Sequence, residues 1–251
     1  MNRLSVVTIT LNEEKHLARA LRSVAKVAHE IVVVDSGSTD KTLEIAKVYE
    51  AKIFYRKFDN YASQKNFAAD KASGDWILAL DGDEIVEEKL LDEIKTAVES
   101  DQFAAYSIPR KNIIFGKFVK HTRWQPELDR HVWLFRKDSG SWSGHVHEEV
   151  KVRGKIGKLK NAKVHYQYET VSEFFEMMNK YSSLEAVEKF GQGFRFSISS
   201  LIIVPLYNFF VRYLYRLGIL DGWRGFALSF LMAIYHIEVV VKVWELQKKN
   251  V

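Results

Sequence analysis

Three acidic residues stand directly behind a short apolar run, in the stretch DWILALDGDE at residues 75–84. The run Trp-Ile-Leu-Ala-Leu has the composition of a buried strand, and Asp81, Asp83 and Glu84 follow it at once. The glycine between the two aspartates permits a tight turn, so both carboxylates can face one cation. Hard cations such as Mg²⁺ and Mn²⁺ prefer oxygen ligands and are commonly held by one or two carboxylates together with substrate phosphates. Asp-Gly is also a common surface turn, but its place at the end of a buried strand favours a divalent cation site.

Residues 81–84, three of them acidic, form what we call the acidic tip of this strand. The first hundred residues have the pattern of strands and helices that would position this tip. Near-continuous apolar runs predict strands at residues 4–11, 30–35, 52–58 and 75–80. Between them, apolar residues recur at three- and four-residue spacing, as in amphipathic helices. Strands of this composition are buried on both faces, so the pattern predicts a mostly parallel α/β sheet flanked by helices.

Polar residues follow three of these strands, at 10–14, 35–40 and 81–84. In an open parallel sheet, ligands bind at the carboxyl ends of the strands. Because those ends lie along the same edge, the three polar segments predict one site and not three.

Four segments, in this order, resemble the motifs of family 2 glycosyltransferases with the GT-A fold: VVTITLNEE, IVVVDSGSTDKT, QKNFAADKASGDWILALDGDE and WSGHVHEE. Within that family the chain is most similar to the lipopolysaccharide-core β-glucosyltransferases. The resemblance implies a Rossmann-like, mostly parallel α/β sheet with flanking helices, followed by C-terminal apolar helices. It also implies an inverting transfer of a hexose, with glucose expected, from a UDP-sugar to a lipid-linked saccharide such as the lipopolysaccharide inner core. The implied cofactor is a divalent cation, Mg²⁺ or Mn²⁺.

The resemblance also assigns roles to residues at the polar edge. Asp35 is expected to bind uracil, Asp81 to lie near the ribose and Asp83 to hold the metal. Apart from the resemblance, His165 in VHYQY of the irregular part is a candidate metal or phosphate ligand. The residues expected to bind the donor are Thr10, Asn12, Glu13, Asp35, Ser38, Lys65, Asn66 and Asp81.

Simpler roles remain open for four of these residues. Asn12 and Ser38 are of types that commonly cap helices. Lys65 is also typical of a solvated helix surface, and a histidine beside a strand, such as His165, is often structural.

A general base is needed to remove the proton of the acceptor hydroxyl, and Glu148 in SWSGHVHEEV is the predicted one. If that segment is a strand, Glu148 and Glu149 face opposite sides, and Glu149 is then a solvated carboxylate at the rim. The alternatives for the base are Asp129 and Glu127 in RWQPELDRHVWLFR.

Three further residues of the irregular part are expected to contact the acceptor or phosphate. Trp124 could stack on a sugar ring, and Arg130 and Arg136 flank an apolar strand where they could bind the diphosphate. The Gln-x-x-Arg-Trp phosphate motif of the family is absent in that form.

The chain is expected to divide at residue 168. Residues 1–168 form the predicted catalytic domain, with a nucleotide-binding half at 1–100 and an acceptor-binding, catalytic half at 101–168. Residues 169–251 are predicted to be helical and to associate with a membrane.

Two segments of this C-terminal region, 197–216 and 223–248, are strongly apolar but interrupted by Arg212, His236 and Glu238. A bilayer core penalises such side chains, so the pattern favours a pair of helices lying at the membrane interface. A soluble helical cap, a dimer interface and a shallow re-entrant pair are the alternatives.

Composition narrows the remaining possibilities. The 251-residue chain has a formal net charge of +5 and no cysteine, which excludes disulfides and thiolate metal sites. No dense Lys/Arg stripe occurs, so nucleic acid is not expected as a partner. The N-terminal run is interpreted as a strand and not as a signal peptide, which places the protein in the cytoplasm at the inner face of the cytoplasmic membrane; the oligomeric state is open.

Two other functions are compatible with a carboxylate-bearing sheet edge. A nucleotidyltransferase would normally open with a Gly/Arg/Lys-rich phosphate loop, which TLNEEKHL lacks. A sugar-nucleotide-binding scaffold without turnover would keep the same residues and release no UDP.

Overall fold

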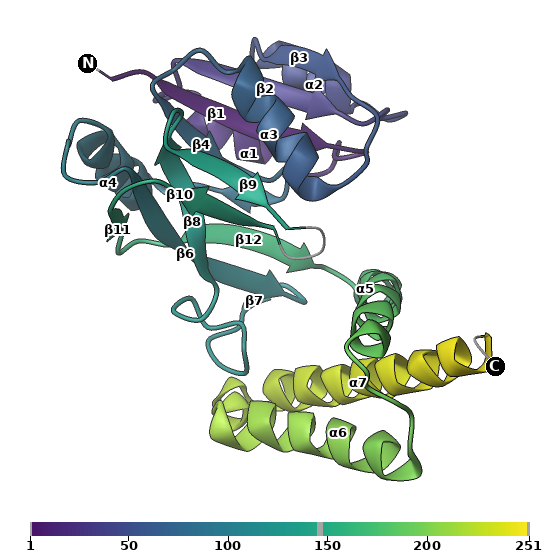
Figure 1. The fold of residues 1–251 in the computed structure, drawn as a ribbon. Helices are drawn as coiled ribbons and strands as arrows, with labels where there is room; N and C mark the ends of the chain where they lie inside the picture. The colour runs from purple at the N-terminus through teal and green to yellow at the C-terminus, as the bar shows by residue number, and fades with distance from the viewer. Residues whose placement is uncertain (1, 145–147, 250–251) are drawn as a thin grey trace. The chain divides into compact units, whose positions relative to one another are not determined.

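A computed structural model describes residues 2–144 and 148–249 (Figure 1). The chain forms two compact units. The first unit consists of the residues up to Lys111 together with Asp129–Tyr166, and the second of Asn112–Leu128 together with the residues from Gln167 onward.

The first unit is built on a parallel sheet, as the apolar runs predicted. Its parallel strands are β1 (Leu4–Thr10), β2 (Glu30–Asp35), β3 (Lys52–Tyr55) and β4 (Trp76–Ala79), in the order β3-β2-β1-β4. β1, β2 and β4 are buried almost throughout, which explains why they show no polar-apolar alternation. Each predicted strand is confirmed with small differences at its ends; the largest is at β3, which stops at Tyr55.

Helices link these strands and cover the sheet. They are α1 (Leu17–Val24), α2 (Thr42–Val48), α3 (Tyr61–Lys71) and α4 (Glu88–Val98). Leu17 and Leu21 of α1 and Ala68 of α3 are buried in the same core as the strand residues Val33 and Leu78. Burying one leucine side chain contributes roughly 1.5–3 kcal/mol, so these contacts hold the sheet edge in place.

The irregular β structure that follows extends the same sheet. Beyond β4 the order continues through β8 (Arg130–Arg136), β6 (Ala105–Ile114), β12 (Lys163–Tyr168) and β5 (Glu84–Ile85). β11 (Ile156–Lys158) pairs with β6, while β9 (Gly140–Ser143) and β10 (Glu149–Val152) form a separate antiparallel pair. In β5 the chain turns back immediately after the aspartates, and Glu84 lies opposite His165 of β12. The acidic tip is thereby brought against β12.

The second unit is mainly helical. It contains β7 (Lys117–Phe118), α5 (Val171–Gly191), α6 (Ile198–Phe210) and α7 (Trp223–Lys249). A π-helix (Val211–Tyr215) and a 3-10 helix (Gly218–Asp221) connect α6 to α7. Capping boxes start α5 and α6, because Thr170 and Ser197 each accept a hydrogen bond from the backbone three residues on. Figure 1 shows α6 and α7 running beside each other.

Two segments of this unit are long and apolar enough to cross a membrane, judged by length and composition alone. They are Ile198–Tyr215 and Trp223–Lys249, whose 18-residue apolar windows have mean hydropathy 1.3 and 1.8. Only 11% of the first apolar window is buried within the protein, against 44% of the second. The first segment is therefore not a core helix of the structure, and many of its apolar side chains, such as Ile203 and Tyr207, are exposed.

Candidate functional site

The ends of β1 and β2 are joined by hydrogen bonds to one buried carboxylate. Thr10 lies opposite Asp35 in the sheet, and its Oγ1 donates to Asp35 Oδ1 at 3.1 Å. The backbone amides of Gly37 and Ser38 both donate to Asp35 Oδ2 at 2.8 Å, and the Ser38 hydroxyl donates to Oδ1. Asp35 therefore organises the loop that follows β2, with the φ of +109° at Gly37 favouring glycine there.

Asn12 and Ser38 link the loops that follow β1 and β2. The backbone amide of Asn12 donates to Ser38 Oγ at 2.9 Å, and the side-chain oxygen Oδ1 of Asn12 accepts from the backbone amide of Thr39 at 2.9 Å. The N-cap residues of α1 and α2 are His16 and Lys41, neither of which makes a side-chain capping bond. The alternative that Asn12 and Ser38 serve as helix caps is therefore wrong, because their side chains cross-link the two loops instead.

A cluster of carboxylates lies at the end of β4. A Cβ added at Gly82 would come within 3.1 Å of Glu13 Cγ, so the glycine lets Glu13 pack against the turn between Asp81 and Asp83. Burial, followed by the negative charges of Asp83 and Asp81, raises the pKa of Glu13 to about 7. Mutual repulsion of this kind favours binding of a cation at the tip.

Lys65 of α3 joins this tip to the predicted base. Its Nζ lies 2.9 Å from Glu148 Oε1 and 3.5 Å from Asp81 Oδ1, and its side chain is only 6% exposed. Burial alone would raise the pKa of Asp81, but the positive charges of Lys65, Lys163 and Arg110 lower it to about 2. The alternative of a solvated Lys65 is therefore wrong. Residues 145–147, which precede Glu148 in its motif and include His147, lie outside the described residues.

Asp83 and His165 form a second pair at the tip. His165 Nε2 lies 3.2 Å from Asp83 Oδ2. Adjacent ligands of an octahedral Mg²⁺ at its usual bond lengths are separated by about 3 Å, so this pair has a spacing that fits two ligands of one ion. Across residues 2–144 and 148–249, no group of three or more histidine, aspartate and glutamate side chains could hold a metal. A bound ion would take its remaining ligands from substrate and water.

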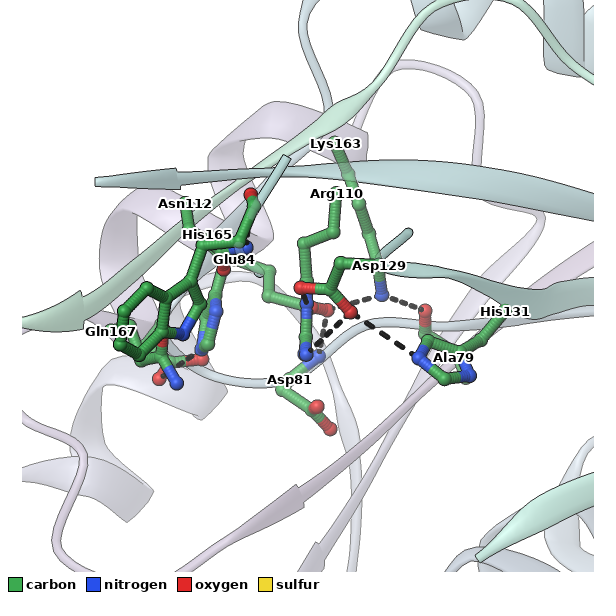
Figure 2. Close-up of polar contacts among 12 residues, drawn as sticks. Ala79, Asp81, Glu84, Arg110, Asn112, Asp129, His131, Lys163, His165 and Gln167 are labelled. Carbon is green, nitrogen blue, oxygen red and sulfur yellow. Dashed lines mark hydrogen bonds and ion pairs between the residues drawn. The ribbon is translucent and has the colours of Figure 1, made fainter. Parts of the chain in front are cut away.

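A buried ionic network that the sequence did not predict lies beside the tip (Figure 2). The side chains of Glu84 and Lys163 are 0% exposed and form an ion pair. Arg110 binds Asp129 through two hydrogen bonds, at 2.9 and 3.0 Å, and its Nη1 lies 3.6 Å from Glu84 Oε1. Lys163 Nζ also lies 3.5 Å from the ring centre of Trp133. The network fixes the start of β5, because Glu84 Oε2 accepts from the Asp81 amide at 3.0 Å.

One signal in the sequence could have revealed part of this network. In KVHYQY the residues Lys163 and His165 occupy alternate positions of a strand, so both point to the same face. A basic pair on one face of an otherwise apolar strand calls for acidic partners, which Glu84 and Asp83 supply.

Comparison with known proteins identifies the family. Residues 5–155 match the family model described as glycosyl transferase family 2. The chain belongs to this family. A protein of Rickettsia felis described as an uncharacterized glycosyltransferase is 31% identical over 100% of the chain and 93% of its own length. The lipopolysaccharide core biosynthesis glycosyltransferase LpsC of Rhizobium meliloti is 30% identical over 96% of the chain and 92% of its own length.

The chain is therefore a family 2 glycosyltransferase, and the resemblance seen in its four motifs is confirmed. Its sheet has the mixed α/β architecture expected of the GT-A fold. A structure of residues 1–349 of S. aureus TarS with UDP-GlcNAc covers 94% of the chain, and 81% of that fragment is covered, at 18% identity. Its TM-score is 0.48, a likeness too distant to add to this assignment.

Two predicted residues of this glycosyltransferase are engaged by backbone groups of the first unit. The side-chain amide of Asn66 exchanges two hydrogen bonds with the backbone of Trp142, both at 2.8 Å, and so fastens α3 to β9. Arg130 Nη1 donates to the carbonyl oxygens of Ser107 and Leu159, at 3.0 and 2.9 Å. The structure thus gives both side chains a structural contact, and their roles toward substrate remain predictions.

Within the first unit, Arg136 is not brought to the acidic tip. Arg136 lies opposite Trp76 at the start of β4 and binds Asp101 Oδ1 at 2.6 Å. Asp81 lies five residue steps beyond Trp76 along this extended segment, a span of about 15 Å. Trp124 belongs to the second unit, where the guanidinium of Arg212 lies 5.0 Å from its ring centre.

The alternatives for the base also differ in their surroundings. Asp129 is held by both hydrogen bonds from Arg110, and its Oδ1 lies 3.2 Å from His131 Nε2. Glu127 belongs to the second unit. Glu149, at the start of β10, is exposed. Glu148 lies 2.9 Å from Lys65 Nζ, the same ammonium group that lies 3.5 Å from Asp81 Oδ1.

Proposed function

We propose that this glycosyltransferase transfers a hexose, with inversion, from a UDP-sugar to a lipid-linked saccharide, and that it needs a divalent cation. The observation that carries the proposal is the position of Lys65, whose ammonium group contacts both Glu148 and Asp81. A single buried cation thus ties the proposed base to the proposed donor site.

Glu148 is the group that would accept the proton of the acceptor hydroxyl. As the acceptor oxygen bonds to the anomeric carbon, the bond from that carbon to UDP breaks, and the hydroxyl proton passes to the carboxylate. The hydrogen bond from Lys65 Nζ fixes the orientation of Glu148. A positioned base of this kind contributes roughly 10²- to 10⁴-fold to the rate.

The proposed cation, Mg²⁺ or Mn²⁺, would be held by Asp83 and His165. A divalent cation supplies positive charge to the diphosphate oxygens as UDP departs. The spacing of the two side chains and the repulsion among Glu13, Asp81 and Asp83 support a cation at this tip.

The cross-linked loops after β1 and β2 support a donor site at the same edge. Thr10, Asn12, Glu13 and Ser38 are proposed to line it, with Asp35 toward uracil. Asp35 already accepts four hydrogen bonds from Thr10 and its own loop. These bonds hold its carboxylate in one orientation, in which it would bind the uracil ring.

The acceptor and the location are proposed from the second unit and from a relative. The outward-facing apolar segment Ile198–Tyr215 supports attachment to the inner face of the cytoplasmic membrane, where lipid-linked saccharides are accessible. LpsC is named for lipopolysaccharide core biosynthesis, which supports a saccharide of the lipopolysaccharide core as acceptor. The inner core and glucose are proposed from the resemblance of the four motifs alone. We retain the proposed division into a catalytic domain at 1–168 and a membrane-associating region at 169–251.

A panel of UDP-, GDP- and ADP-sugars tests the donor. The purified protein is incubated with each sugar nucleotide and a lipid-linked acceptor, with Mn²⁺, with Mg²⁺ or with EDTA, and nucleotide release and product are measured. We expect turnover with a UDP-hexose that EDTA abolishes. Preference for another nucleotide would contradict the roles proposed for the loop after β2, and binding without turnover would favour the scaffold alternative.

Substitutions at Glu148 and Asp83 test the chemistry. Glu148→Gln is expected to lower transfer by roughly 10²- to 10⁴-fold while UDP still binds, because only the proton acceptor is lost. Asp83→Asn is expected to abolish cation-dependent UDP affinity as well as transfer. The matched control is Glu149→Gln, an exposed neighbour expected to leave the rate unchanged; if it is slowed as much as Glu148→Gln, the assignment of the base is wrong.

A further inference from the structure

Positive charge is concentrated where α6 and α7 are connected. Residues 112–128 and 211–224 of the second unit contain six cationic side chains and two acidic ones. The cations are Lys117, Lys120, Arg123, Arg212, Arg216 and Arg224, and the acids are Glu127 and Asp221. The backbone amide of Thr122 donates to the carbonyl of Arg216 at 3.0 Å, so the two segments lie against each other.

The acid within the connection, Asp221, is already engaged. Its Oδ2 accepts from the His121 amide at 2.9 Å, and its Oδ1 accepts from the Lys120 amide at 3.3 Å and lies 3.1 Å from His121 Nδ1. These bonds hold residues 120–121 to the segment between α6 and α7. The carboxylate of Asp221 therefore pairs with this loop and, within the described part of the chain, forms no ion pair with Arg123, Arg212 or Arg216.

Arg212 is a buried cation of a different kind from those in the first unit. It is 7% exposed, and its Nε and Nη1 are buried without a hydrogen-bond partner. Among the described residues no carboxylate forms an ion pair with it; its guanidinium instead lies over the ring of Trp124, at 5.0 Å from the ring centre. A buried charge without a counter-ion is costly, so its presence indicates that an anion binds nearby.

A pocket of about 440 Å³ lies at this place. Its walls are formed by Arg123, Tyr207, Asn208, Val211, Tyr215 and Arg216. Guanidinium groups bind phosphate oxygens with paired, charge-assisted hydrogen bonds, and the two tyrosine hydroxyls are further donors. Arg212 follows Val211 directly in the chain, so the unpaired buried cation belongs to the same helical turn as the pocket wall.

Large apolar side chains surround the cations and face outward. Leu220 is 65% exposed, Trp223 66% and Tyr215 75%. Exposed aromatic and aliphatic groups next to cations suit the membrane interface, where the apolar groups enter the acyl boundary and the cations remain at the depth of the headgroup phosphates.

We propose that this pocket binds the phosphate of an anionic membrane lipid and thereby anchors the connection between α6 and α7 at the bilayer surface. The inference rests on the membrane-surface part of the proposed function but concerns a site separate from sugar transfer. Arg123 and Arg216 hold the phosphate from the pocket walls, and the uncompensated charge of Arg212, next in the chain to the wall residue Val211, adds to the positive potential there.

Vesicles that differ only in the anionic group test the proposal. Vesicles of neutral glycolipid carry phosphatidic acid or, at equal mole fraction, cholesteryl hemisuccinate, whose anion is a carboxylate. Partitioning of the intact protein is measured by flotation without any sugar nucleotide, so the result does not depend on transfer. We expect clearly tighter binding to the phosphatidic acid vesicles, and a loss of at least about tenfold in Arg123→Gln/Arg216→Gln.

A matched charge control is Lys180→Gln/Lys189→Gln on α5, which removes the same two charges elsewhere in the unit and should leave binding unchanged. If thermal melting shows that the double variant is unfolded, the single variant Arg123→Gln replaces it in the vesicle assay. Arg123 is exposed, so this substitution should leave the fold intact. Equal binding to both kinds of vesicle, or equal losses in the two double variants, would overturn the proposal. Inorganic phosphate binding as tightly as the lipid vesicles would overturn the assignment to lipid.

Discussion

The two units of the chain differ in whether a buried cationic side chain is paired with a carboxylate. In the first unit, Lys163 is fully buried and forms an ion pair with Glu84. In the second, Arg212 is nearly as buried, yet no carboxylate among the described residues pairs with it. A paired buried charge is part of the scaffold, whereas an unpaired one indicates a ligand from outside the chain.

The first unit also contains an unpaired ionisable group, but this one is an acid, Glu13. Glu13 lies beside Asp81 and Asp83, and no cation among the described residues pairs with its carboxylate. Its pKa is raised to about 7, first by burial and then by the two aspartates. By the same reasoning as for Arg212, the unpaired carboxylate of Glu13 indicates a bound cation.

Breaking the paired charge should have the largest effect on stability. Lys163→Met leaves Glu84 buried without its cation, so the free energy of unfolding should fall by about 3–5 kcal/mol. Denaturant titration measures the change. Lys95→Met is the matched control, since Lys95 is 59% exposed and its partner Asp92 is 69% exposed, and its loss should be below about 1 kcal/mol. Adding Glu84→Gln to Lys163→Met should restore part of the stability; no recovery would mean that the pair is not the cause.

The unpaired carboxylate predicts a dependence of stability on pH. In the unfolded chain Glu13 has its ordinary pKa of 4.5, whereas the folded value is about 7. Between these values the folded protein binds more protons than the unfolded chain, so stability falls as pH rises through this window. Glu13→Gln should therefore raise the free energy of unfolding by roughly 1–3 kcal/mol at pH above 7 and change it little below 4.5.

Glu13 also provides a test of whether a cation binds at the acidic tip. Binding of Mn²⁺ at the tip favours the ionised form of Glu13, so Mn²⁺ affinity should rise with pH up to about 7 and binding should release protons. Calorimetry in buffers of different ionisation enthalpy measures the proton release. Glu13→Gln should reduce it, and an unchanged proton release in that variant would show that the cation binds elsewhere.

Removing the unpaired cation should have the smallest effect on stability. Arg212→Met is expected to change the free energy of unfolding by less than about 1 kcal/mol, because the lost stacking on Trp124 is offset by removing an uncompensated buried charge. Thermal melting of Arg212→Met and Lys163→Met under the same conditions compares the two losses of stability. A loss as large as that of Lys163→Met would show that Arg212 has an internal partner and would weaken the proposed phosphate site.

Several parts of the fold and site were predictable because they depend on local pattern. The strands β1 to β4 were predicted from apolar runs, and the polar segments after them from the rule that parallel strands end along one edge. Lys65 and Glu148 were each predicted separately as donor contact and base. Their contact spans 83 residues, and no local pattern predicts that they meet.

The buried network beside the tip was not predicted, for the same reason. Glu84 and Lys163 are 79 residues apart, and each alone is compatible with a solvated turn or an exposed strand position. The helix-cap alternative for Asn12 failed in a similar way, since its partners Ser38 and Thr39 come from another loop.

By itself the sequence determined the family, the order of the strands along the chain and the residue types at the acidic tip, because these follow from composition, periodicity and motif. Only the tertiary structure decided which charges are paired, with Lys65 between Glu148 and Asp81 and with Arg212 alone. Pairing depends on which distant segments pack together, and an ion pair loses its strength within a few ångströms. A charge's function therefore becomes visible only when its neighbours are in place.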